Sequence, residues 1–105
     1  MATNRVEMLK QMVEQDPANS FARYGLAMEY ANGGALEQAV EEFQNLINLD
    51  ANYTAAYFHG GQALEKLGRI EQARTTYEQG IEAASRKGDA HTRAEIEAAL
   101  GALPV

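Results

Sequence analysis

The sequence contains two nearly identical hexamers, GALEQA at Gly34–Ala39 and GRIEQA at Gly68–Ala73, which lie 34 residues apart. Residues of similar type recur in the same register on both sides of them. The matched pairs include Tyr24 with Phe58, Phe43 with Tyr77, and Ile47 with Ile81. A period of this length is typical of stacked structural units, each of which buries its apolar face only against its neighbours. We therefore expect a short array of repeats.

Within each unit the apolar residues follow the spacing of an amphipathic helix. In the first unit the series runs Leu36, Ala39, Val40, Phe43, Leu46 and Ile47. Strand-like alternation is absent from the sequence, and glycine, proline or Asp/Asn clusters interrupt the helical pattern at regular places. The spacing predicts six helices, over residues 4–14, 20–32, 36–49, 54–67, 70–85 and 90–101. The predicted fold class is all-α.

The composition fits one small domain. The chain has 105 residues, 46% of them hydrophobic, and it has no cysteine, which excludes disulfide bonds and thiolate metal sites. Charges at Arg5, Glu7 and Lys10 argue against an export signal, and no apolar run approaches the roughly 18 residues of a membrane span. We therefore expect a soluble, cytoplasmic protein with no membrane partner.

The net charge is −6 and is unevenly distributed. Residues 1–52 carry eight acidic and three basic side chains, whereas residues 53–105 carry seven and six. An acidic surface repels phosphate backbones, and the basic residues form no stripe with aromatic ones. Nucleic acid is therefore not an expected partner.

Small and aromatic residues occupy matching places in the two units. On the second helix of each unit the pairs are Ala39 with Phe43 and Ala73 with Tyr77. On the first helix the pattern is Leu26, Ala27 and Tyr30 in the first unit, and it is matched more loosely by Gly60, Gly61 and Leu64 in the second. The units resemble tetratricopeptide repeats, which are helix-turn-helix pairs of about 34 residues. Two features depart from the family pattern. The opening aromatic is Tyr57 in the second unit but Arg23 in the first, and Ala51 and Ser85 replace the closing proline.

The resemblance implies antiparallel helix-turn-helix repeats stacked as a short right-handed α-solenoid of about six helices. We expect a single domain over residues 1–105, made of an N-terminal half-repeat helix at 1–19, repeats at 20–53 and 54–87, and a C-terminal capping helix at 88–105. Thr92 with Glu95 offers a capping box for the last helix, and an earlier start at Asp89 is the alternative.

Packing accounts for the repeated hexamer. Gly34 and Gly68 fall in the turn between paired helices, where a left-handed backbone favours glycine. Ala39 and Ala73 mark the place where the paired helices should approach most closely. The hexamer therefore does not indicate a reactive site.

A search for chemical motifs predicts no catalytic residue, no cofactor and no metal. His59 and His91 lack a second ligand at metal-binding spacing, and we expect each to be solvated or on a helix surface and not to be a ligand. Gly60-Gly61 lies inside a predicted helix and lacks the Lys-Ser/Thr of a phosphate loop, so close helix packing explains it better. We expect a protein that is not an enzyme. A small enzyme or ligand carrier that uses His59 or His91 is the less favoured hypothesis.

In the family, side chains on the first helix of each unit line a concave groove that binds an extended peptide. The resemblance carries this role to Phe21, Tyr24, Met28, Ala31, Ala55, Phe58, Gln62 and Glu65. Members that clamp a terminal carboxylate use Lys, Asn and Arg there, and this sequence does not. An aromatic and methionine surface bordered by Glu29 and Glu65 better suits an apolar or mildly basic peptide or helix.

Two other interpretations of this apolar stripe remain open. The N-terminal helix or the curvature of the chain could already cover Phe21 and Tyr24. Alternatively, the same stripe could close a homodimer, or the repeats could stack end to end. The sequence favours a non-enzymatic adaptor or scaffold that binds a protein or peptide partner.

Overall fold

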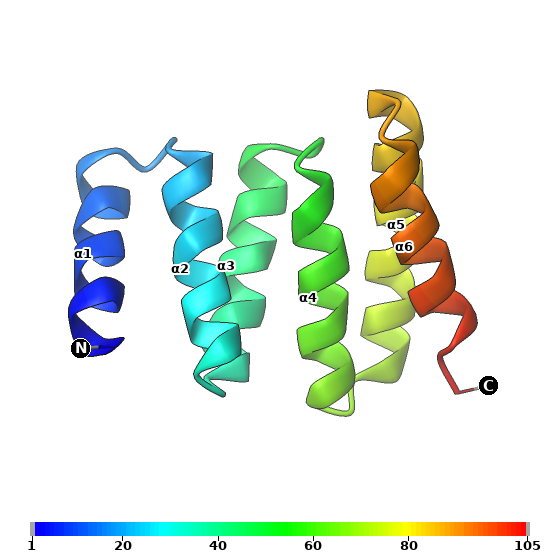
Figure 1. Ribbon diagram of the computed structural model, residues 1–105, viewed down its shortest axis with the longest axis horizontal. Helices are drawn as coiled ribbons and strands as arrows, with labels where there is room; N and C mark the ends of the chain where they lie inside the picture. The colour runs from blue at the N-terminus through cyan, green and yellow to red at the C-terminus, as the bar shows by residue number, and fades with distance from the viewer. Residues whose placement is uncertain (1, 105) are drawn as a thin grey trace.

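The computed structural model describes residues 2–104, with side chains described from Arg5 onward. Figure 1 shows the helices in a row, with α1 at one end and α5 and α6 at the other. The helices are α1 (Ala2–Gln15), α2 (Ser20–Asn32), α3 (Leu36–Leu49), α4 (Thr54–Lys66), α5 (Ile70–Lys87) and α6 (Ala90–Gly101). No strand is found between residues 2 and 104. The predicted all-α fold of six helices is therefore confirmed.

The turns between paired helices have the backbone that the repeated hexamer predicts. Gly34 and Gly68 have φ values of +83° and +77°, in the left-handed region that costs glycine little. Each turn closes with a backbone hydrogen bond, from Ala35 N to Tyr30 O at 2.8 Å and from Arg69 N to Leu64 O at 2.9 Å. The two hexamers therefore begin with the same turn.

Helix α5 runs two residues further than the sequence analysis predicts. Because Ser85 stands in place of the closing proline, the backbone hydrogen bonds continue until Gly88 takes a left-handed conformation. The N–H of Asp89 then donates to the carbonyl of Ala84 at 2.9 Å, and only two residues separate α5 from α6. The other bounds differ from the predicted ones by two residues or fewer.

The core lies between paired helices and between neighbouring units. Ala39 and Ala73 are fully buried, as predicted for the points of closest approach. At Gly61 the approach is so close that an added Cβ would lie 2.1 Å from Cε1 of Tyr77. Glycine at position 61 is therefore a packing requirement, which confirms the interpretation of Gly60-Gly61 as close packing.

Helix α6 packs on both α4 and α5, whereas α1 packs on α2 alone among the described helices. Asp89 caps α6, because its carboxylate accepts a hydrogen bond from Thr92 N at 3.1 Å and another from Thr54 Oγ1 at 2.7 Å. The capping box at Thr92 is therefore wrong, and the alternative start at Asp89 is correct. Within residues 2–104, no helix is both long and apolar enough to cross a membrane.

Candidate functional site

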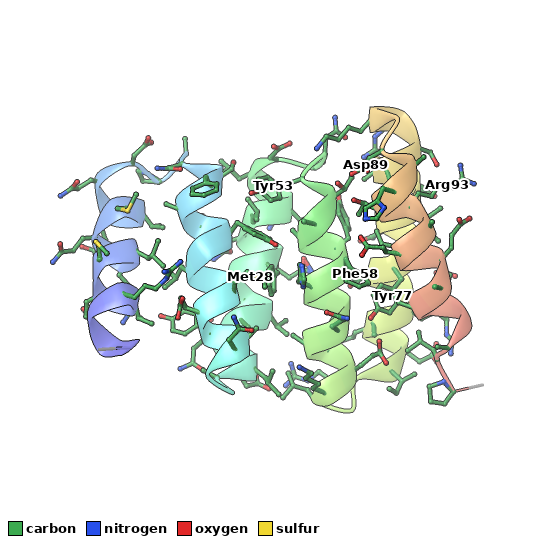
Figure 2. The ribbon with its side chains drawn as sticks, in the orientation of Figure 1. Met28, Tyr53, Phe58, Tyr77, Asp89 and Arg93 are labelled. Carbon is green, nitrogen blue, oxygen red and sulfur yellow. The ribbon has the colours of Figure 1, made fainter. Side chains whose placement is uncertain are left out.

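The predicted groove residues lie on two neighbouring helices. Phe21, Tyr24, Met28 and Ala31 belong to α2, and Ala55, Phe58, Gln62 and Glu65 belong to α4. These two helices contact each other, and α4 in turn contacts α6. Figure 2 shows Met28 on α2 and Phe58 on α4. We refer to the surface made by α2, α4 and α6 as the first-helix face.

The eight side chains differ in exposure. Phe21 is 77% exposed, and Gln62 is also exposed. The remaining six are half-buried. Met28, Tyr24 and Ala31 pack against the cluster of buried residues around Phe43, and Phe58 packs against the cluster around Tyr77. The face is therefore a partly buried apolar strip, with Phe21 projecting from it.

Tyr24 joins the two repeats. Its ring centroid lies 5.3 Å from that of Tyr53, 6.0 Å from that of His59 and 6.4 Å from that of Phe43. Distances in this range are typical of favourable aromatic pairs. Tyr24 therefore contributes to packing between the units.

His59 is half-buried and lies among aromatic rings. Its ring is 5.2 Å from Phe58 and stacks at 6.4 Å on Phe43. Burial lowers the pKa of His59 below its usual value, although a hydrogen bond with Gln62 and the carboxylate of Glu95 act in the opposite direction. His59 is thus a half-buried residue of helix α4. Its aromatic neighbours were not expected, because the register matches position 59 with Gly25 in the first unit.

The carboxylate of Glu65 on α4 is held by a buried residue of α5. The hydroxyl of Tyr77, a fully buried residue of α5, donates a hydrogen bond to Oε2 of Glu65. Burial and the neighbouring Glu65 carboxylate both raise the pKa of Tyr77. Gln62, Glu65 and Lys66 also line a cavity of about 220 Å³. Glu65 thus presents an anchored negative charge beside the apolar strip.

Helix α6 adds residues to this face that the sequence analysis did not include. The residues that cap α2, α4 and α6 at their N-terminal ends are Asn19, Tyr53 and Asp89, and they align the three helices. The distance from Tyr53 to Asp89 is 36 residues and not 34, because α5 is longer. On this register His91, Ala94 and Ala98 correspond to Ala55, Phe58 and Gln62. All three are exposed. The longer α5 hid this correspondence from a search at a period of 34.

The described residues hold no group of three or more His, Asp or Glu side chains that could bind a metal ion. His91 lies 3.7 Å from Glu95 on the surface of α6, and His59 lies among aromatic rings. The chemistry that this face offers is therefore apolar contact together with scattered carboxylates.

Comparison with known proteins gives consistent matches along the chain. A family model described as tetratricopeptide repeat matches residues 1–95. A TPR repeat-containing protein of Pseudomonas aeruginosa is 31% identical over 98 residues, which cover 93% of each chain. Among solved structures, a tetratricopeptide repeat domain protein of Salinibacter ruber is 35% identical, with a TM-score of 0.75 over 81% of this chain and 86% of that one.

A more distant structure is similar in fold. The structure of PcrH in complex with the chaperone binding region of PopD gives a TM-score of 0.90 over 96% of this chain and 77% of that one, at 19% identity. Identity at this level supports a shared architecture only.

Proposed function

Because the chain belongs to the tetratricopeptide repeat family, we propose that it is a non-enzymatic protein-interaction module that binds an apolar or mildly basic peptide or helix on the first-helix face. The observation that carries the proposal is Phe21. Phe21 is 77% exposed and continues the apolar strip of half-buried Tyr24 and Met28, and contiguous apolar surface is typical of an interaction site.

The composition of the face supports this class of partner. Met28 offers a flexible apolar contact, and aromatic side chains are frequent anchors of protein interfaces. The carboxylates of Glu65 and Glu95 stand on α4 and α6, so a basic residue beside the apolar anchors of the partner would gain favourable electrostatic contacts. A strongly acidic peptide would be repelled.

The comparisons support an interaction role at the level of the family. PcrH, which shares this fold, is seen with a segment of another protein, PopD. The face of the present chain has its own residues, with Phe21, Met28 and Phe58 as its large apolar side chains. We therefore propose a partner that is recognised by its apolar side chains.

The test compares proteins captured by the immobilised chain with those captured by a variant. Phe21→Ala with Gln62→Lys changes two exposed residues of the first-helix face. Leu49→Ala is the matched control, since Leu49 is an exposed apolar residue at the end of α3. We expect specific partners to be lost with the double variant and retained with the control.

Two results would argue against the proposal. Equal capture by both variants would place binding on another surface. Capture of the chain alone, lost with the double variant, would instead favour the homodimer through the same apolar stripe.

A further inference from the structure

Glu65 is the acidic residue among the eight predicted groove residues. Its Oε2 atom accepts the hydrogen bond from the hydroxyl of Tyr77, so a fully buried residue holds the half-buried carboxylate in place. A carboxylate can accept several hydrogen bonds, and no ion pair within residues 5–104 includes Glu65. The carboxylate therefore keeps acceptor capacity for a partner at the cavity that it lines with Gln62 and Lys66.

The arginines of the neighbouring helices and turns are in ion pairs with other carboxylates. These pairs are Arg5–Glu29, Arg23–Glu42, Arg69–Glu37, Arg74–Glu71 and Arg93–Glu97. Arg86 donates to Asn52, which lies before the opposite end of α4 from Glu65, and Lys87 ends the antiparallel helix α5. None of these cations neutralises Glu65.

Lys66 is the cation that stands beside Glu65. It is exposed and lines the same cavity, but it forms no ion pair with Glu65 within the described part of the chain. Glu95 on α6 is a second carboxylate of the first-helix face, and it lies 3.7 Å from His91. The face thus carries two carboxylates against one lysine, and it attracts a cationic side chain more than an anionic one.

An apolar contact lies at a fixed distance from this charge. Phe58 and Glu65 are seven residues apart on α4, which is close to two helical turns, so they lie on one face and about 10 Å apart. Phe58 is half-buried and packs against the cluster that contains Tyr77, the residue that also holds Glu65. The core therefore fixes both the apolar contact and the carboxylate.

The first-helix face suits a helix better than an extended segment. Among the eight groove residues, Tyr24 and Gln62 carry the neutral side chains that can both donate and accept hydrogen bonds. The backbone of an extended peptide on this apolar strip would lose water from N–H and C=O groups without enough partners to replace it. A helix satisfies these groups internally, and its side chains seven residues apart lie on one face at about 10 Å.

We propose that the first-helix face binds an amphipathic helix in which an apolar side chain contacts Phe58 and a lysine or arginine seven residues away pairs with Glu65. This inference rests on the proposed function, because it specifies the partner of the same face. Tyr77 acts as a positioning residue, since its hydroxyl holds the carboxylate that the basic side chain contacts. An acidic residue at that place in the partner is repelled.

A peptide selection measures the spacing directly. We would display random peptides of about 16 residues, which is roughly four helical turns, and select them on the immobilised chain. Parallel selections would use Glu65→Lys and the Phe21→Ala, Gln62→Lys variant of the first-helix face. On the wild type we expect lysine or arginine to be enriched seven residues from an apolar residue. On Glu65→Lys we expect an acidic residue at the same spacing.

An enriched peptide then allows a double-mutant cycle by calorimetry. Glu65→Gln, or norleucine in place of the basic residue of the peptide, should weaken binding about threefold to fivefold, and both changes together should weaken it no further. Lys66→Gln is the matched control at the adjacent exposed position, and it should bind the peptide at least as tightly as the wild type.

Tyr77→Phe tests the positioning role. The variant should lose part of the preference for the basic peptide over the norleucine peptide, while its affinity for the norleucine peptide stays the same. A purely structural role of Tyr77 would instead weaken both peptides equally, which would overturn this part of the proposal. Circular dichroism would check that each variant keeps its helices.

The outcomes separate this inference from the proposed function. Peptides without a basic residue at this spacing that are lost with the Phe21→Ala, Gln62→Lys variant would overturn the inference and leave the proposed function intact. Basic and apolar residues enriched two or three positions apart would identify an extended segment, which also overturns the inference. No enrichment, or enrichment that the double variant retains, would contradict the proposed function and the inference together.

Discussion

The hydroxyl of Tyr77 on α5 donates a hydrogen bond to the carboxylate of Glu65 on α4, and so links a fully buried ring to the edge of the first-helix face. The same ring is the reason that position 61 is glycine. One residue of the second helix therefore sets both the spacing of the pair and the orientation of a surface charge.

Replacing Tyr77 with phenylalanine tests the hydrogen bond without emptying the core. We expect a loss of about 1 kcal/mol in the free energy of unfolding, because the bond has a charged acceptor that is half-exposed to water. Urea unfolding at pH 7 measures it. A variant as stable as the wild type would show that the bond contributes nothing.

The same variant has a predicted pH dependence. Since the pKa of Tyr77 is raised in the folded protein, the unfolded chain loses this phenolic proton first, near pH 10. The stability that Tyr77 contributes is present below that pH and is lost as the pH rises above it. The free energy of unfolding should therefore fall less steeply above about pH 10 in Tyr77→Phe than in the wild type.

Gly61→Ala tests the close approach of α4 and α5. The new Cβ would lie within 2.6 Å of three atoms of the buried Tyr77 ring, so the helices must separate. We expect a loss of about 1–3 kcal/mol despite the better helix propensity of alanine. Gly101→Ala is the control, since a Cβ there meets no atom within 4 Å. Equal melting temperatures for the two variants would contradict the packing argument.

His59 should make the fold sensitive to mild acid. Its pKa is lowered by burial, so the unfolded chain binds a proton first as the pH falls below about 6.5. The stability that neutral His59 contributes is full above that pH and is lost below it. Thermal unfolding between pH 7 and pH 5 should show a smaller decline in His59→Gln than in the wild type. An equal decline in His59→Gln and the wild type would contradict this role of His59.

Substitutions of Phe21 and Tyr24 should differ in their effect on the free energy of unfolding. Phe21→Ala should change the free energy of unfolding by less than about 0.5 kcal/mol, because its ring is exposed. Tyr24→Ala should cost about 2 kcal/mol, because it removes contacts to Tyr53, His59 and Phe43. Chemical unfolding of both variants checks this difference, and equal costs would mean that Phe21 is also structural.

The fold was predictable from the sequence because its structural units repeat every 34 residues. The glycines of the turns and the alanines of close approach recur at a spacing of 34, and both have the expected geometry. The extension of α5 was not visible, because it depends on which residue ends the helix after Ser85. That extension also moved the register of α6, and so His91, Ala94 and Ala98 were missed as part of the first-helix face.

The environment of single side chains was harder to predict than the fold. His59 has no aromatic counterpart in the first unit, since Gly25 occupies the matching position. The anchoring of Glu65 depends on a tyrosine twelve residues away whose hydroxyl the helical pattern does not place. The exposure of Met8 and Met12 depends on the contacts of α1, which packs on α2 alone among the described helices, and the sequence pattern does not show this.

The most direct test of the proposed function is photo-crosslinking at position 21. A photoreactive phenylalanine analogue would replace Phe21, and in a second sample Leu49, in cells of the source organism. We predict a defined adduct with a partner protein at position 21 that is absent at position 49. No adduct at position 21, or the same adducts at both positions, would contradict binding on the first-helix face.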